Sequence, residues 1–98
     1  QDILAANNWN VVQYAVLVHM FAQVSGLVPG ELVHVIADAH IYDRHVPIIR
    51  EMLEREPLPA PTFRLNPEVR DFYRFTVEHL ILEDYQKHPQ FCNIPIAV

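Results

Sequence analysis

Residues 11–24 read VVQYAVLVHMFAQV, and this stretch decides the fold because apolar side chains occur on nearly every side of it. Its Ala, Leu, Met and Gln residues favour a helix despite the valines, and we expect that helix to run from Asn10 to about Ser25. Asn8 or Asn10 stands where a capping residue would begin it, and Gly26 stands where a left-handed C-terminal cap is typical. A helix without a polar face must be buried, so the sequence predicts a layer of structure on each side of it.

The segment after this helix predicts a strand and a second, shorter helix. Residues 32–42, LVHVIADAHIY, are rich in β-branched side chains, which favour an interior strand with both faces covered. Residues 44–56, RHVPIIREMLERE, place apolar side chains on one helical face, and Asp43 stands in the capping position before them. Pro47 is compatible with this helix because it falls in the first turn.

The remaining residues predict a small sheet. Residues 62–66 and 76–85 are predicted strands, and residues 67–75 between them are predicted to form a turn or short helix. We therefore expect an α/β (α+β) fold, with one long buried helix packed on a β-sheet and a shorter helix beside it. A chain of 98 residues is the size of one small domain, so residues 1–98 are predicted to form a single domain.

The composition excludes several classes of protein. The net charge is −5 and the seven Lys and Arg residues are scattered, which disfavours nucleic-acid binding. The single cysteine, Cys92, rules out an intrachain disulfide and indicates a reducing, cytoplasmic location. The first residues carry no signal-peptide pattern, and the longest apolar stretch is shorter than the ~20 residues that span a bilayer. A soluble protein without a membrane partner is expected.

His40 and Tyr42 are the first candidate site residues. If the predicted strand reaches Tyr42, both side chains project from one face, and an imidazole beside a phenol suits a sugar hydroxyl or a carbonyl. From the spacing alone, satisfied polar groups at a strand end are the better explanation. His34 and His45 do not extend the pair into a metal site, because their separations match no known ligand spacing. Cys92 is disfavoured as a nucleophile, since no neighbouring cation or helix N-terminus favours its thiolate.

Asn10 and Trp9 are candidates at the start of the long helix. An amide at the mouth of a buried helix can donate and accept hydrogen bonds at once, as recognition of a uracil edge requires. Taken singly, Asn10 is better explained as a capping or first-turn residue, and Trp9 as a core residue.

Read in order along the chain, several short motifs resemble those of thymidylate synthase. Each motif is weak by itself, but the ordered set covers nearly the whole chain and reaches its last residue. The matching positions are Asp2, Asn10, YAVLVHMFAQ (14–23), DAHIYDRH (38–45), REPLPAP (55–61), KHP (87–89) and PIAV (95–98).

The resemblance implies reductive methylation of dUMP to dTMP with 5,10-methylenetetrahydrofolate, in a homodimer. By this resemblance Asn10 recognises the uracil edge, and His40 and Tyr42 bind the 3′-hydroxyl of the deoxyribose. Gln1 occupies the variable position of the family's Arg-Ser-x-Asp run. The implied dUMP-binding set is Gln1, Asp2, Asn10, His40, Ile41 and Tyr42.

The same resemblance implies a folate site that the C-terminal segment closes. Asp2 matches the aspartate that hydrogen-bonds the pterin, and the closing segment excludes water from the reacting groups. Ala6 and Asn8 stand where the family usually has a glycine and a proline, and Ala6 departs from the pattern because a glycine lets the backbone approach a ligand more closely. The implied folate-binding set is Asp2, Trp9, Ala97 and Val98.

The family's nucleophile is not among these residues. It lies in a Pro-Cys-His element that this sequence does not contain, so no catalytic residue is assigned and the chain alone is expected to be inactive without the N-terminal portion. Two other readings stay open. One is a non-catalytic module that oligomerises or binds nucleotide. The other is a pyrimidine nucleotide hydroxymethylase, although Asn10 suits uracil better than cytosine.

Overall fold

Helix α1 (Asn7–Val24) is the axis of the fold in the computed structural model, which describes residues 1–96. Its 18 residues confirm the long helix that the apolar stretch predicts. Gly26 follows it with a φ of 68°, and the N–H of Leu27 donates to the carbonyl of Ala22 at 2.8 Å. The left-handed C-terminal cap is therefore confirmed, since glycine adopts a positive φ without steric cost.

The start of α1 differs from the sequence prediction. The helix begins after Ala6 and no side chain caps it, so the capping roles expected of Asn8 and Asn10 are wrong. The carbonyl of Asp2 instead accepts hydrogen bonds from the N–H groups of Ala6 and Asn7, at 3.3 and 2.8 Å. The chain enters the helix through a turn at Asp2, and this turn supplies an acceptor for two of the N–H groups that the start of a helix leaves without a helical partner.

The second helix, α2 (Val46–Glu54), follows a short 3-10 helix, η1 (Asp43–His45). The expectation that Asp43 caps α2 is wrong, because this residue lies inside η1 and makes no capping hydrogen bond. Pro47 stands in the first turn as predicted, where its missing N–H leaves no helical hydrogen bond unmade. Ile49 is buried on the apolar face, which confirms a shorter amphipathic helix.

Two antiparallel strands form the sheet of the described residues, β1 (Thr62–Leu65) and β2 (Leu80–Glu83). The predicted turn or short helix before β2 is confirmed by the 3-10 helix η2 (Phe72–Arg74). The predicted strand 76–85 is shorter than expected, since its first residues form a further 3-10 helix, η3 (Val77–His79). Two helices and a two-stranded antiparallel sheet give the predicted α+β class.

Residues 32–42 do not form the predicted strand. Their one ladder contact is an isolated parallel bridge between His40 and Asp2. There the N–H of Ile3 donates to the carbonyl of His40 at 3.0 Å, and the N–H of His40 donates to the carbonyl of Gln1 at 3.1 Å. A strand is defined by hydrogen bonds to a neighbour, and the described residues supply a neighbour at this single point. The predicted strand over residues 32–42 is therefore wrong, because the described residues contain no neighbouring strand with which it could pair.

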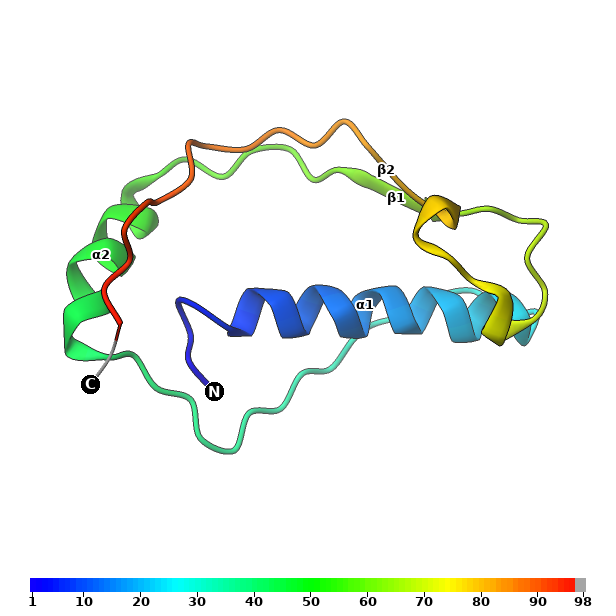
Figure 1. Cartoon of the computed structure of the whole chain (residues 1–98), viewed down its shortest axis with the longest axis horizontal. Helices are drawn as coiled ribbons and strands as arrows, with labels where there is room; N and C mark the ends of the chain where they lie inside the picture. Colours follow the sequence, from blue (N-terminus) through cyan, green and yellow to red (C-terminus); the bar gives the residue numbers. More distant parts are fainter. Residues whose placement is uncertain (97–98) are drawn as a thin grey trace.

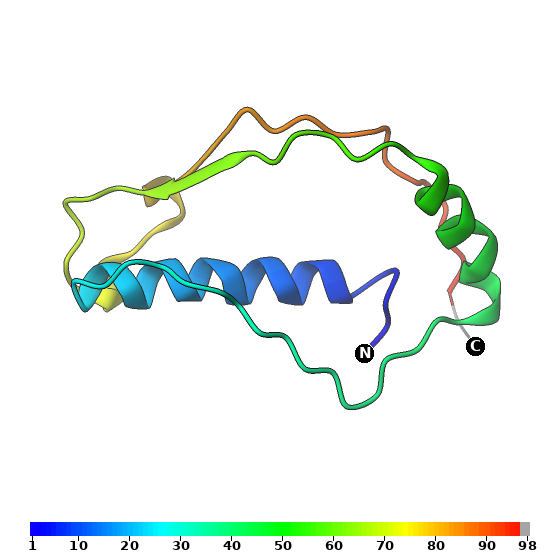
Figure 2. The same cartoon turned by 180° about the vertical axis from the view of Figure 1, so that it is seen from behind.

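The chain surrounds α1 with an open loop. The two strands pass on one side of α1, α2 lies beyond one of its ends, and residues 27–42 return on the other side (Figure 1). Figure 2 shows the same arrangement from behind. The radius of gyration is 16.4 Å, whereas a compact domain of this size has about 13 Å. The described residues therefore cover α1 only in part. The buried apolar residues among them are Leu4, Ala22, Ile49 and Leu65.

The C-terminal half of α1 makes the aromatic contacts that hold the sheet. Phe21 stacks on Phe72 of η2, with ring centroids 4.8 Å apart. His19 meets the edge of Phe63 in β1 at 5.0 Å. These contacts leave the N-terminal half of α1 next to the polar residues at the start of the chain.

Candidate functional site

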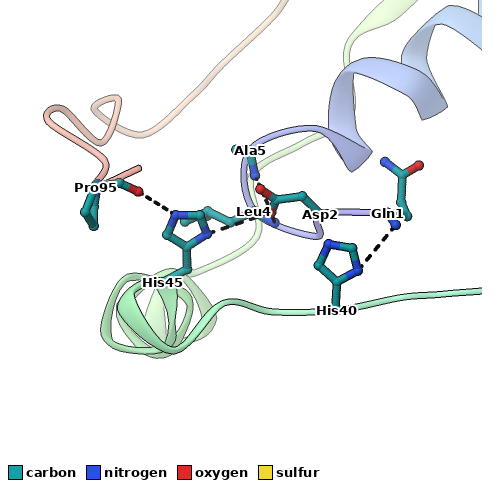
Figure 3. A network of polar contacts seen from close by, with 7 residues as sticks. All are labelled: Gln1, Asp2, Leu4, Ala5, His40, His45 and Pro95. Atoms are coloured by element: carbon teal, nitrogen blue, oxygen red, sulfur yellow. Dashed lines mark hydrogen bonds and ion pairs between the residues drawn. The ribbon is translucent and has the colours of Figure 1, made fainter. Parts of the chain in front are cut away.

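Polar side chains from three segments meet near the N-terminus of α1. They come from the first two residues, from the first turns of α1, and from the segment that leads into α2. Figure 3 shows four of them beside Pro95. We call this group the polar corner, and its members are Gln1, Asp2, Asn10, His40, Tyr42 and His45.

Asp2 is fixed by the turn that it forms. Its Oδ1 atom accepts hydrogen bonds from the N–H groups of Leu4 and Ala5, at 3.0 and 3.1 Å (Figure 3). An aspartate that bonds the backbone two residues later is a typical turn former. The side chain is still 20% exposed. Asp2 is therefore an oriented carboxylate with accessible surface.

Gln1 joins two of the candidate residues. Its Nε2 atom donates to Oδ1 of Asn10 at 2.9 Å. Its backbone nitrogen lies 3.4 Å from Nδ1 of His40, and its carbonyl accepts the N–H of His40. The amide of Asn10 and the imidazole of His40 are thereby held on either side of one residue.

His40 and Tyr42 lie side by side, as their spacing suggested. Their ring centroids are 5.0 Å apart at an interplanar angle of 75°, so the rings meet edge to face. His40 also lies 3.6 Å from the exposed carboxylate of Asp38. This pairing arises without the predicted strand, because the extended backbone near Tyr42 keeps the alternation of side chains.

His45 is the residue of the polar corner that the sequence reading missed. It is 2% exposed, and its Nε2 atom donates to the carbonyl of Pro95 at 2.8 Å (Figure 3). A helical period places His45 on the same face as Ile49 and Met52 of α2. That position on an apolar stripe was the available signal of burial.

Basic and imidazole side chains hold the C-terminal segment, residues 88–96, which we call the tail. Near its start, Nε2 of His88 donates to the carbonyl of Glu56 at 2.7 Å. Arg55 donates to the carbonyl of Pro89 at 2.8 Å and lies 3.9 Å above the ring of Phe91. The tail therefore runs back along α2 toward the polar corner, as Figure 1 also shows.

The other predicted site residues make no contact described above with the polar corner. Trp9 is 80% exposed on the first turn of α1, so the core role considered for it is wrong in this chain. Ile41 is partly exposed between His40 and Tyr42. Ala97 and Val98 lie outside the described residues.

A large apolar hollow adjoins the polar corner. It measures about 1040 Å³ and lies between α1 and residues 27–38, and Gln1 and Asp38 line the end nearest the corner. Its walls include Tyr14, Leu17, Phe21, Leu32 and Ile36. Pockets for small ligands commonly measure about 300–1,000 Å³, so this hollow has the volume for an organic ligand or for side chains of another segment.

Residues 1–96 contain neither a membrane-spanning helix nor a cluster of metal-binding side chains. Neither helix in this part is long and apolar enough to cross a membrane. Groups of three or more His, Cys, Asp or Glu residues in a metal-binding arrangement do not occur there.

Comparison with known proteins links the whole chain to one family. A family model described as thymidylate synthase matches residues 1–98. Among solved structures, the thermostable thymidylate synthase A from Bacillus subtilis is 41% identical and superposes with a TM-score of 0.90. That match covers 93% of this chain and 33% of the other chain. The present chain therefore spans about a third of the length of the protein that it matches.

Proposed function

The chain belongs to the thymidylate synthase family, and we propose that residues 1–98 are the C-terminal domain of a synthase that methylates dUMP to dTMP with 5,10-methylenetetrahydrofolate. The observation that carries the proposal is that Gln1 joins Asn10 to His40, since its side chain donates to Asn10 and its carbonyl accepts the N–H of His40. These side chains come from segments far apart in the sequence, and they bring an amide, an imidazole and the phenol of Tyr42 together. Such a set of donors and acceptors suits a nucleoside.

In this proposal the polar corner binds dUMP. Asn10 pairs with the uracil edge, because one amide offers a donor to O4 and an acceptor to N3–H. Uracil would replace the hydrogen bond from Gln1 to Asn10. His40 and Tyr42 bind the 3′-hydroxyl, with Ile41 between them. The full proposed set is Gln1, Asp2, Asn10, His40, Ile41 and Tyr42.

Asp2 and Trp9 fit the folate in the same proposal. The backbone bonds to Oδ1 use part of the hydrogen-bonding capacity of the Asp2 carboxylate, which accepts about four bonds in all. The rest is available to the N–H groups of a pterin ring. Trp9 offers an exposed aromatic face at the start of α1. Ala97 and Val98 would close over the ligand and exclude water.

The proposed reaction needs a thiolate that adds to C6 of the pyrimidine. Cys92 does not suit this role, since it lies exposed in the tail and its thiol donates to the carbonyl of Gln90 at 3.7 Å. We therefore assign no catalytic residue to this chain. The nucleophile would come from an N-terminal portion of the synthase, and the chain alone would not turn over.

Assembly is part of the proposal. Large apolar side chains are exposed on α1 and on residues 27–35, which supports both a homodimer and contact with the N-terminal portion. A cytoplasmic location agrees with the single free cysteine. Light scattering coupled to size-exclusion chromatography would test association, and a clean monomer at high concentration would count against the dimer.

The deciding experiment uses a completed synthase, in which the preceding portion of the Bacillus subtilis enzyme is joined to residues 1–98. We expect conversion of dUMP to dTMP with methylenetetrahydrofolate. We expect Asn10→Asp to lose dUMP in favour of dCMP, because a protonated acid donates to N3 of cytosine and its carbonyl accepts from the exocyclic amine. Asn8→Asp is the matched control, since Asn8 is exposed on the same turn of helix. A completed synthase that folds but never methylates dUMP would refute the proposal.

Two other functions remain as outcomes of these experiments. The exposed apolar surface favours a non-catalytic module that associates or binds nucleotide weakly. A thermal titration of the chain with dUMP separates the two cases, because a ligand of the folded state raises the melting temperature. No shift together with a discrete oligomer would indicate the module. A pyrimidine nucleotide hydroxymethylase would reveal itself by preferring dCMP without any substitution.

A further inference from the structure

The tail is attached to the rest of the chain at two separate places. Its start is held by the contacts of His88 and Arg55 described above. Its far end is held by His45, which donates to the carbonyl of Pro95 at 2.8 Å, and by Arg44, which lies 3.4 Å from the carbonyl of Ile96. The Arg44 contact is exposed and long, whereas the His45 contact is buried. His45 is therefore the stronger attachment of the far end.

His45 lies between the tail and the turn at Asp2. One ring nitrogen, Nε2, bonds Pro95, and the other, Nδ1, points toward Oδ1 of Asp2 at 3.8 Å (Figure 3). A distance of 3.8 Å is too long for a hydrogen bond, and this buried Nδ1 has no hydrogen-bond partner among the described residues. His45 is thus in close proximity to Asp2 without a hydrogen bond, and it makes a hydrogen bond to Pro95.

The chemistry of Pro95 fixes the protonation of one ring nitrogen. A carbonyl only accepts, so Nε2 of His45 must carry a hydrogen. In the neutral ring Nδ1 then presents a lone pair toward Asp2, and in the charged ring it presents an N–H. Both states keep the bond to Pro95. The position of the tail and the orientation of the Asp2 carboxylate therefore depend on the same ring.

We propose that His45 is a positioning residue that couples the far end of the tail to the turn at Asp2, so that tail docking and the orientation of Asp2 change together. The coupling stands on the contacts within the chain. Its consequence for folate rests on the proposed function, because Asp2 is there the pterin ligand and the tail is the closing segment. Folate bound at Asp2 would then favour the docked tail, and a docked tail would favour bound folate.

Hydrogen exchange of the backbone amides in the 98-residue chain tests the coupling directly. His45→Leu removes both ring nitrogens, His45→Gln keeps a donor near the position of Nε2, and His45→Asn keeps an amide near the position of Nδ1. Chymotryptic cleavage after Phe91 measures tail docking, and we expect it to be about tenfold faster in the Leu and Asn variants, as the loss of one buried hydrogen bond implies. The amides of Leu4 and Ala5 should accelerate in the Leu variant. The Gln variant should protect the tail nearly as well as histidine.

A second histidine in the tail provides the matched control. His88 also bonds a carbonyl, that of Glu56, but it does not contact the turn at Asp2. His88→Leu should therefore accelerate cleavage after Phe91 and leave the exchange of Leu4 and Ala5 unchanged. Equal protection in the Gln and Asn variants of His45 would mean that packing alone holds the tail, and would overturn the coupling. A tail that is cleaved after Phe91 in the unsubstituted chain as fast as in the unfolded chain would overturn it as well.

Kinetics of the completed synthase form the second arm of the test. His45→Asn should raise the KM for methylenetetrahydrofolate about tenfold while the Kd for dUMP stays unchanged, and His45→Gln should restore the KM. A purely structural role would instead alter both ligands or neither. If the unsubstituted completed synthase proves inactive, the proposed function fails, and the exchange experiment still decides whether His45 couples tail and turn.

Discussion

Helix α1 and the polar corner depend on their own chain to very different degrees. Along α1 the described residues bury only Ala22, while Trp9 and Val12 are 80% and 62% exposed. In the polar corner His45 is buried between the Asp2 turn and the tail. The helix carries an apolar surface that residues 1–96 do not cover, whereas the corner finds its partners within the chain. In the proposed synthase a further segment or a second copy would cover α1, whereas contacts within the chain already hold the tail against the polar corner.

The largest expected effect is on the unfolding free energy, and it tests whether the exposed surface of α1 is covered in a complete synthase. Val12→Lys puts a charge on an exposed part of the helix, so it should change the unfolding free energy of the chain alone by less than about 0.5 kcal/mol. In the completed synthase the same lysine would be buried without a partner and should cost about 3–5 kcal/mol. Urea unfolding of both proteins measures the difference.

A valine outside α1 gives the control for this substitution. Val77 in η3 is 75% exposed, and Val77→Lys should be nearly neutral both in the chain and in the completed synthase. If Val12→Lys were equally neutral in both proteins, α1 would be a solvent-facing helix and its apolar surface would need another explanation.

The same contrast explains what the sequence could predict. The helix and its Gly26 cap were predictable because helix hydrogen bonds and a positive φ are local properties. The strand expected over residues 32–42 was not, because a strand needs a partner and the described residues pair with it only at His40. Composition alone thus identified the segment as extended and apolar without showing what pairs with it.

The polar corner was predictable in part for a related reason. The pairing of His40 with Tyr42 followed from side-chain alternation, which any extended backbone provides. The helical spacing of His45 with Ile49 gave a signal of burial, but its hydrogen-bond partner Pro95 lies 50 residues further along the chain, and no local pattern reveals that contact. The expected cap at Asp43 failed because the intervening 3-10 helix shifts the start of α2 to Val46.

The next largest effect tests whether α2 packs against a core formed by this chain alone. Ile49→Ala removes a buried side chain and should cost about 2 kcal/mol in the unfolding free energy of the chain alone. Leu53 lies on the same helix and is 77% exposed, so Leu53→Ala should cost less than about 0.5 kcal/mol. Urea unfolding of the two variants measures both values. Equal losses would show that α2, like α1, has no core of its own in this chain.

A smaller effect concerns the C-terminal end of α1, where a side chain of the helix bonds the segment after β1. Nε2 of Gln23 donates to the carbonyls of Asn66 and Val69, at 2.9 and 2.8 Å. Gln23→Ala should therefore cost about 1–2 kcal/mol. Gln13→Ala is the control, since Gln13 is exposed on the same helix. Thermal unfolding of the two variants would contradict this view if both shifted the melting temperature alike.

The smallest effect is on the pKa of Glu78 in η3, and it should be the same in the chain alone and in the completed synthase. A hydrogen bond from the Thr76 side chain, aided by the Glu78 backbone N–H, holds the pKa of the exposed Glu78 below its ordinary range. The folded state then binds a proton less readily than the unfolded state, so the charged carboxylate contributes a small stability at neutral pH. This contribution is lost as the pH falls below about 4, where the group becomes protonated. Thr76→Val should raise the pKa, which NMR titration measures in the chain and in the completed synthase. A change in the Glu78 pKa that differed between the two proteins would mean that the segments covering α1 also alter the surroundings of η3.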